Sequence, residues 1–142
     1  MKKTILALST IAVLAISCKN EADPFLVKEQ NIGMLTDSTQ VKDLDIIFAK
    51  DSIVKPIAGD EFAGSVNTIE VYETGGKHLL SITPKQVLDS TSTISIVKFK
   101  DPRYQTEKGV NNLSTFEDIE KNYKISTIQN SFKRASVFVK GK

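Results

Sequence analysis

The sequence predicts an α+β chain of two tandem units, each one helix followed by antiparallel β-strands, behind a signal peptide and a short tether. Three observations lead to this prediction. A ten-residue pattern of helical type occurs twice, 75 positions apart, and β-rich runs follow both copies. An apolar N-terminal stretch ends at Cys18, the single cysteine of the chain. These features indicate location and architecture rather than a reaction.

Residues 1–17 have the properties of a secretory signal peptide. Two lysines follow Met1, and an apolar run then extends to Ile16, interrupted by Ser9 and Thr10. A positive head, a short apolar core and small residues at the exit are typical of such signals. The run is shorter than the roughly 20 residues that a membrane-spanning helix needs.

Cys18 is the predicted lipidation site. Ala15-Ile16-Ser17-Cys18 resembles the lipobox of bacterial lipoproteins, whose cysteine receives a diacylglyceryl group and becomes the mature N-terminus. The resemblance implies that two acyl chains hold the protein stably on a membrane. Ala15 stands where the lipobox usually has leucine, and Ala15-Ile16-Ser17 also fits the cleavage site of ordinary secretion. A lone free thiol is unusual in an oxidising compartment, which favours the lipoprotein.

Residues 18–23 then form the lipidated cysteine and a tether, and residues 24–142 form the α+β domain. Five extended residues reach at most roughly 18 Å, so the domain is expected close to the membrane. Unit one covers about residues 24–83, a connecting strand covers 92–100, and unit two covers about 101–142.

The two predicted helices share their pattern. "TQVKDLDIIF" (residues 39–48) and "STFEDIEKNY" (residues 114–123) align without a gap. Apolar residues recur at helical spacing in both. They are Val41, Leu44 and Phe48 in the first copy, and Phe116, Ile119 and Tyr123 in the second. Ser114 and Glu117 fit a capping box, whereas Thr39 has Lys42 at the position of the glutamate.

Strands are predicted after each helix. "SIVKPI", "TIEVYE" and "HLLSIT" follow the first, with Gly75-Gly76 as a hairpin turn between the last two. "STISIVKFK" is the connecting strand, closed by a turn at Asp101-Pro102. "KISTIQ" and "SVFVK" follow the second helix.

The strand "SVFVK" (residues 136–140) is expected to have an open edge. The sequence reaches Gly141-Lys142 where unit one would turn back into a further strand. An unpaired edge is a template for pairing with another chain. The alternatives are a shortened version of a longer protein, an edge covered by unit one, and a partner recruited by strand addition.

Composition excludes several classes of function. Without the two signal lysines, the chain has 17 basic and 17 acidic residues. This balance gives no electrostatic case for a nucleic-acid partner or for steering toward anionic lipid. His78, the single histidine, follows the Gly75-Gly76 turn and is expected to be solvated. One histidine and one lipid-committed cysteine cannot form a conventional zinc site. Paired acids lie next to lysines on outer helix faces. The sequence therefore predicts no catalytic residue, no metal and no cofactor.

Two surface features remain. The turn "DPRYQTEKG" (residues 101–109) presents Arg103 and Tyr104, residue types favoured at interfaces, as a candidate interaction loop. The alternative is that the tyrosine ring packs inside while Arg103 is solvated. The segment from residue 131 onward has no acid and four cations, which would suit lipid head groups or a solvated strand face. The cations are Lys133, Arg134, Lys140 and Lys142.

Over roughly residues 31–139, the chain resembles uncharacterised bacterial envelope lipoproteins with a helix-plus-strand repeat. "IGMLTDST" with "LDIIF", and "DPRYQTEKGVNNLSTFEDIEKNY", are the segments that carry this resemblance. In topology it is similar to secreted inhibitors of β-lactamase and to small outer-membrane assembly lipoproteins. The resemblance implies a non-enzymatic, lipid-anchored envelope protein that binds or supports another macromolecule, with an unidentified protein partner. The outer membrane is expected, on either its periplasmic or its surface face. An enzyme inhibitor acting through a surface loop is the second hypothesis, and an enzyme is the third.

Overall fold

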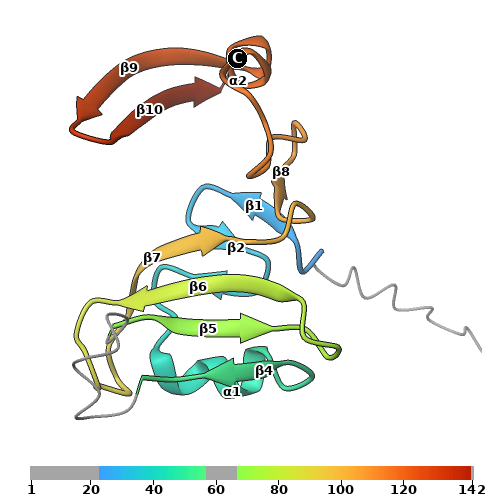
Figure 1. Ribbon diagram of the computed structural model, residues 1–142, viewed down its shortest axis with the longest axis vertical. Helices are drawn as coiled ribbons and strands as arrows, with labels where there is room; N and C mark the ends of the chain where they lie inside the picture. The colour runs from blue at the N-terminus through green and yellow to red at the C-terminus, as the bar shows by residue number, and fades with distance from the viewer. Residues whose placement is uncertain (1–22, 57–66, 142) are drawn as a thin grey trace, which may run out of the picture.

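The computed structural model describes residues 23–56 and 67–141 (Figure 1). The predicted signal peptide and Cys18 lie outside the described residues. Over these described residues the fold is mostly β, with 44% strand and 13% helical residues, two short helices and three sheets. The prediction of an α+β fold made of two helix-plus-strand units is therefore wrong.

The main sheet contains four antiparallel strands in sequence order. They are β4 (Ser52–Val54), β5 (Ile69–Tyr72), β6 (His78–Pro84) and β7 (Ile94–Phe99). The predicted hairpin at Gly75-Gly76 is confirmed, since both glycines have positive φ and the Gly76 amide donates to the Glu73 carbonyl at 2.8 Å. The predicted connecting strand is β7, which pairs with β6 along its whole length. It belongs to the sheet and does not separate two units.

A second, smaller sheet crosses the predicted unit boundary. Its order is β3 (Leu35–Thr36), β2 (Asn31–Ile32), β1 (Leu26–Lys28) and β8 (Gln105–Thr106), with β1 and β8 parallel. β8 comes from the predicted second unit and the other three strands come from the first. The pairing of β1 with β8 joins segments almost 80 residues apart, and no local pattern encodes it.

The hydrophobic core lies between the inner face of the main sheet, the small sheet and the first helical segment. That segment consists of η1 (Val41–Asp43) and α1 (Leu44–Ile47). As predicted from their spacing, Val41, Leu44 and Phe48 are buried. The remaining buried apolar side chains are Leu35, Ile69, Val71, Leu79, Leu80, Ile82 and Tyr104. The Thr39 hydroxyl accepts from the Thr36 amide, so it closes a turn before the helix.

The second helix, α2 (Phe116–Asn122), has no buried residue. Its N-cap is Thr115, whose hydroxyl accepts from the Asp118 amide, while the Thr115 amide donates to the Asp118 carboxylate at 2.7 Å. The predicted cap at Ser114 is one residue early, because the Ser114 hydroxyl accepts from the Asn111 amide instead. No helix in the described part of the chain is long and apolar enough to cross a membrane.

The chain then forms a two-stranded antiparallel ribbon, β9 (Tyr123–Ser131) and β10 (Arg134–Gly141). Figure 1 shows this ribbon and α2 at one end of the molecule, away from the main sheet. Within residues 23–56 and 67–141, β10 pairs with β9 alone. The open edge predicted along residues 136–140 is confirmed for this part of the chain.

Candidate functional site

The predicted interaction loop forms an ionic clamp, in which Arg103 binds the buried Asp101 and the partly exposed Glu73. Asp101 lies two residues after the end of β7 and is fully buried. Its carboxylate accepts from Nε and Nη2 of Arg103 at 2.9 and 2.7 Å, and from the Arg103 amide at 2.9 Å. Lys77 Nζ lies 2.9 Å from the same carboxylate. Hydrogen bonds from Arg103, then from its amide and Lys77, hold the pKa of Asp101 far below its ordinary value despite burial.

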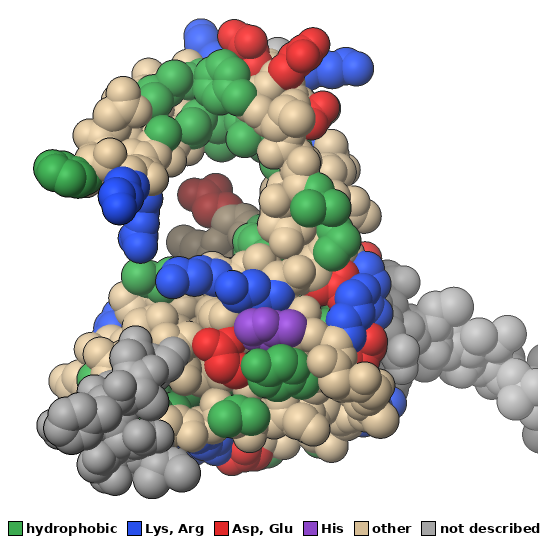
Figure 2. Space-filling model, viewed as in Figure 1, with side chains coloured by type: hydrophobic (Ala, Val, Ile, Leu, Met, Phe, Trp, Pro, Cys, Tyr) green, Lys and Arg blue, Asp and Glu red, His purple; other side chains and the backbone are tan. Residues whose placement is uncertain are grey.

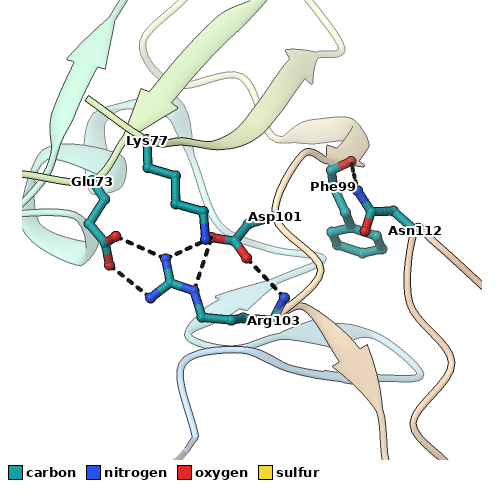
Figure 3. Close-up of polar contacts among 6 residues, drawn as sticks. All are labelled: Glu73, Lys77, Phe99, Asp101, Arg103 and Asn112. Atoms are coloured by element: carbon teal, nitrogen blue, oxygen red, sulfur yellow. Dashed lines mark hydrogen bonds and ion pairs between the residues drawn. The ribbon is translucent and has the colours of Figure 1, made fainter. Parts of the chain in front are cut away.

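The other side of the Arg103 guanidinium binds Glu73. Nη1 and Nη2 donate to its two carboxylate oxygens at 2.9 and 3.0 Å, a bidentate pair. Glu73 and Lys77 flank the β5–β6 turn, so the clamp ties the loop after β7 to that hairpin (Figure 3). The Arg103 side chain is 38% exposed, but its donors are directed at two carboxylates. The hydrogen bond from Arg103 lowers the pKa of Glu73.

Tyr104 is a core residue. It is only 3% exposed, and its ring packs edge-on against Phe25 at 5.0 Å and stacks on Phe99 at 5.6 Å. The Arg103 guanidinium lies 4.4 Å above the Phe25 ring. Burial raises the pKa of the Tyr104 hydroxyl to about 12. The loop thus uses Arg103 for an internal ion pair and Tyr104 for internal packing, and Tyr104 offers no surface to a partner.

A second polar cluster, which sequence analysis missed, lies on the outer face of the main sheet. His78 was expected to be solvated, but its Nε2 lies 2.7 Å from Oε2 of Glu70 and its ring stacks on Tyr72 at 4.6 Å. The Ser81 hydroxyl donates to the same Glu70 oxygen at 2.5 Å. Figure 2 shows the histidine on this face between acidic and basic side chains. Strict alternation could not have revealed the cluster, because His78 and Ser81 are three residues apart and share a face only through the register shift between β5 and β6.

This cluster contains the residue types of a hydrolase but a different arrangement. In a catalytic triad the serine donates to the histidine, and the acid orients the histidine from its other nitrogen. Here the carboxylate of Glu70 binds both partners through one oxygen, and the distance from Ser81 Oγ to His78 Nε2 is 3.5 Å. Ser81 is also buried. The three side chains satisfy one another and connect two neighbouring strands.

The β9–β10 ribbon is the third feature, and it is the most exposed one. Nearly all its described side chains are exposed, including the apolar residues Ile128, Phe132, Phe138 and Val139. Its base is fixed by Lys108, whose Nζ donates to the Asn122 carbonyl at 2.8 Å and lies 4.6 Å above the Tyr123 ring. Beyond this base, the ribbon has two strand edges available for further pairing.

An open groove of about 970 Å³ separates the ribbon from the small sheet. Apolar side chains from both sides line it: Val27, Val110, Ile119, Tyr123, Val137 and Val139. Charged residues form its rim, among them Lys28 and Glu107, which pair at 3.1 Å. One face of the ribbon therefore looks onto a partly apolar channel.

Within residues 23–56 and 67–141, no group of three or more His, Cys, Asp or Glu side chains is placed to hold a metal ion. In comparisons with known proteins, no family model, no curated protein and no solved structure matches this chain.

Proposed function

We propose that this chain is a lipid-anchored, non-enzymatic protein of the bacterial cell envelope that binds another envelope macromolecule through its β9–β10 ribbon. The location is supported by the sequence of residues 1–18, with its positive head, short apolar run and lipobox-like end at Cys18. A diacylated cysteine would place the domain beside a membrane, because the tether of residues 19–23 is short.

The observation that carries the binding function is the open edge of β10. Each strand of a two-stranded ribbon pairs on one side only, so half of its ladder groups point outward. An extended segment of a partner can bind there by strand addition, with main-chain hydrogen bonds for affinity and side-chain contacts for specificity. Val137 and Val139 lie on the face that lines the groove, so a partner strand at this edge would lie next to apolar surface.

The side chains of the two polar clusters are bound to one another, which supports a non-enzymatic function. Arg103 is bound by Asp101 and Glu73, and Glu70 is shared by His78 and Ser81. In both clusters, side chains with catalytic potential bind each other and join neighbouring segments of the fold.

Site-specific photocross-linking in the native envelope tests the binding surface. A benzophenone amino acid replaces Phe138 on the ribbon, or Ile46 on α1 as a matched control. Ile46 is an apolar residue that is 80% exposed, and α1 lies at the opposite end of the molecule from the ribbon (Figure 1). We expect a discrete cross-linked product from position 138 and none from position 46. Val137→Pro, which disrupts β10 outside the core, should abolish the product. Equal products from both positions, or none from position 138, would contradict the assignment.

The anchor is tested separately. Metabolic labelling with palmitate should label the wild-type chain and leave Cys18→Ala unlabelled and without its lipid anchor. A labelled Cys18→Ala chain would refute lipidation at this residue without affecting the result at the ribbon.

A further inference from the structure

The tip of the ribbon combines an apolar side chain with two cations. Phe132 is fully exposed, at 109% of the reference value, and Lys133 and Arg134 follow it directly. Phe132 has φ 38°, a left-handed conformation that turns usually assign to glycine or asparagine. A large aromatic residue thus occupies a position that backbone conformation disfavours, and its side chain has no packing role in the described fold.

Charge is strongly segregated along the chain. Residues 123–142 carry five Lys or Arg and no Asp or Glu, whereas residues 18–122 carry twelve basic and seventeen acidic residues. The near-zero charge of the mature chain therefore hides a basic ribbon on an acidic body. Figure 2 shows basic side chains near the free end of the ribbon. The last four described cations are Lys124, Lys133, Arg134 and Lys140.

We infer that the ribbon tip docks on an anionic lipid surface, with Phe132 entering the interface and Lys133 and Arg134 contacting lipid head groups. An aromatic residue at the membrane interface removes apolar surface from water, and adjacent cations are attracted to an anionic leaflet. This inference concerns the tip, whereas the proposed function concerns the ribbon edges. It requires no acyl chain, so it can fail or succeed independently of the anchor.

Charge also argues against a second copy of this chain as the occupant. Two ribbons meeting at their tips would bring like charges together, since neither carries an acid. The acidic body of a second copy would present opposite charge, but its apolar groove faces its own ribbon. An anionic membrane offers negative charge and an apolar layer in the same place.

Tryptophan fluorescence tests this inference directly, because the chain contains no tryptophan. The chain from residue 18 onward carries Cys18→Ala, so that no acyl chain holds it, and it contains every residue that the structure describes. Phe132→Trp reports on the tip and Ile46→Trp is the matched control. Vesicles contain phosphatidylcholine alone or mixed with phosphatidylglycerol. We expect a blue shift and quenching by brominated lipid for Phe132→Trp on anionic vesicles, and neither change for Ile46→Trp.

Neutralising Lys133 and Arg134 measures how much these two cations contribute to vesicle binding. Each basic residue near an anionic surface contributes about fivefold in binding, so Lys133→Gln with Arg134→Gln should weaken vesicle binding about 25-fold. Lys42→Gln with Lys50→Gln makes the same change in net charge on the α1 side and should leave binding near the wild-type value. Salt near 1 M, which shortens the screening length to about 3 Å, should also weaken binding.

Three results would overturn the inference. Equal binding to vesicles without phosphatidylglycerol would remove the role of charge. A blue shift of Phe132→Trp that grows with protein concentration in the absence of vesicles would assign the tip to a second copy. No shift on anionic vesicles, with the ribbon still folded by circular dichroism, would assign the tip to a partner other than lipid.

Discussion

Replacing Asp101 with asparagine should lower the free energy of unfolding by about 3 kcal/mol at neutral pH. The carboxylate is fully buried and accepts three hydrogen bonds from Arg103 while paired with Lys77. Breaking a buried ion pair by removing one partner costs about 3–5 kcal/mol. The lower end applies because Arg103 and Lys77 are partly exposed and Arg103 keeps Glu73, so both cations can be solvated again.

The same variant should change the acid limb of stability. The pKa of Asp101 is lowered in the folded state. Ionised Asp101 therefore adds to the free energy of unfolding at pH values above its unfolded-state pKa of about 3.9, and this stabilisation is lost as the pH falls below that pKa. While the folded carboxylate stays ionised, this group alone makes wild-type stability fall by about 1.4 kcal/mol per pH unit, and Asp101→Asn should lack that slope.

Urea denaturation followed by circular dichroism, between neutral pH and pH near 2, measures both effects. Glu73→Gln is the matched control, because it removes the other, partly exposed partner of Arg103 and should be clearly less destabilising than Asp101→Asn. A loss of less than about 1 kcal/mol for Asp101→Asn, or an unchanged acid limb, would refute the role assigned to the clamp.

Three further predictions concern local features. Thr115→Ala removes the N-cap of α2, which stabilises the helix by about 1 kcal/mol. The α2 amide hydrogens should therefore exchange with solvent about fivefold faster, and an unchanged exchange rate would contradict the cap. Amide exchange along residues 136–140 should alternate between slow and fast, because a strand paired on one side protects every second amide, and uniform protection would mean that both edges are paired. Gly33→Ala should lower the free energy of unfolding by roughly 2 kcal/mol or more. Gly33 has φ 57°, and a Cβ there would lie 2.1 Å from the Pro24 carbonyl oxygen. A thermal unfolding midpoint within experimental error of wild type would refute this prediction.

The positions of most strands could be predicted from the sequence, but their pairing could not. Alternating apolar residues and the Gly75-Gly76 turn locate β5 and β6, because both signals are local. The assignment of β7 as a connector failed because its partner in the sheet is determined by the fold of the whole chain. The parallel pair of β1 and β8 depends on contacts far apart in sequence, which no spacing reveals.

The two similar helical patterns show how the environment decides burial. Leu44 and Phe48 pack into the core because the main sheet lies against their helix. Phe116 has the same helical spacing to its neighbours but is about half exposed, and no residue of α2 is buried. Spacing predicts which residues share a face, and only the surrounding elements decide whether that face is covered.

The candidate loop was located correctly as a turn, but residue type could not define its role. Arginine and tyrosine are frequent both at interfaces and in internal clamps. The deciding partner of Arg103 is Glu73, 30 residues earlier in the chain. The cluster of Glu70, His78 and Ser81 was missed for the same reason, since its members come together through the register of β5 and β6.

The low stability expected of a two-stranded ribbon is a reason for its open edge to bind a partner strand. An isolated two-stranded hairpin is at best marginally stable in water, and three or more strands or a packed face are needed for independent stability. The described ribbon is supported at its base by Lys108 and α2, while its outer half packs on nothing. A partner strand added along β10 would supply the third strand. The Asp101 clamp and the core lie in the other part of the molecule, so partner binding can order the ribbon without changing the core. The changes in free energy of unfolding caused by a variant in the ribbon and a variant in the clamp should therefore add.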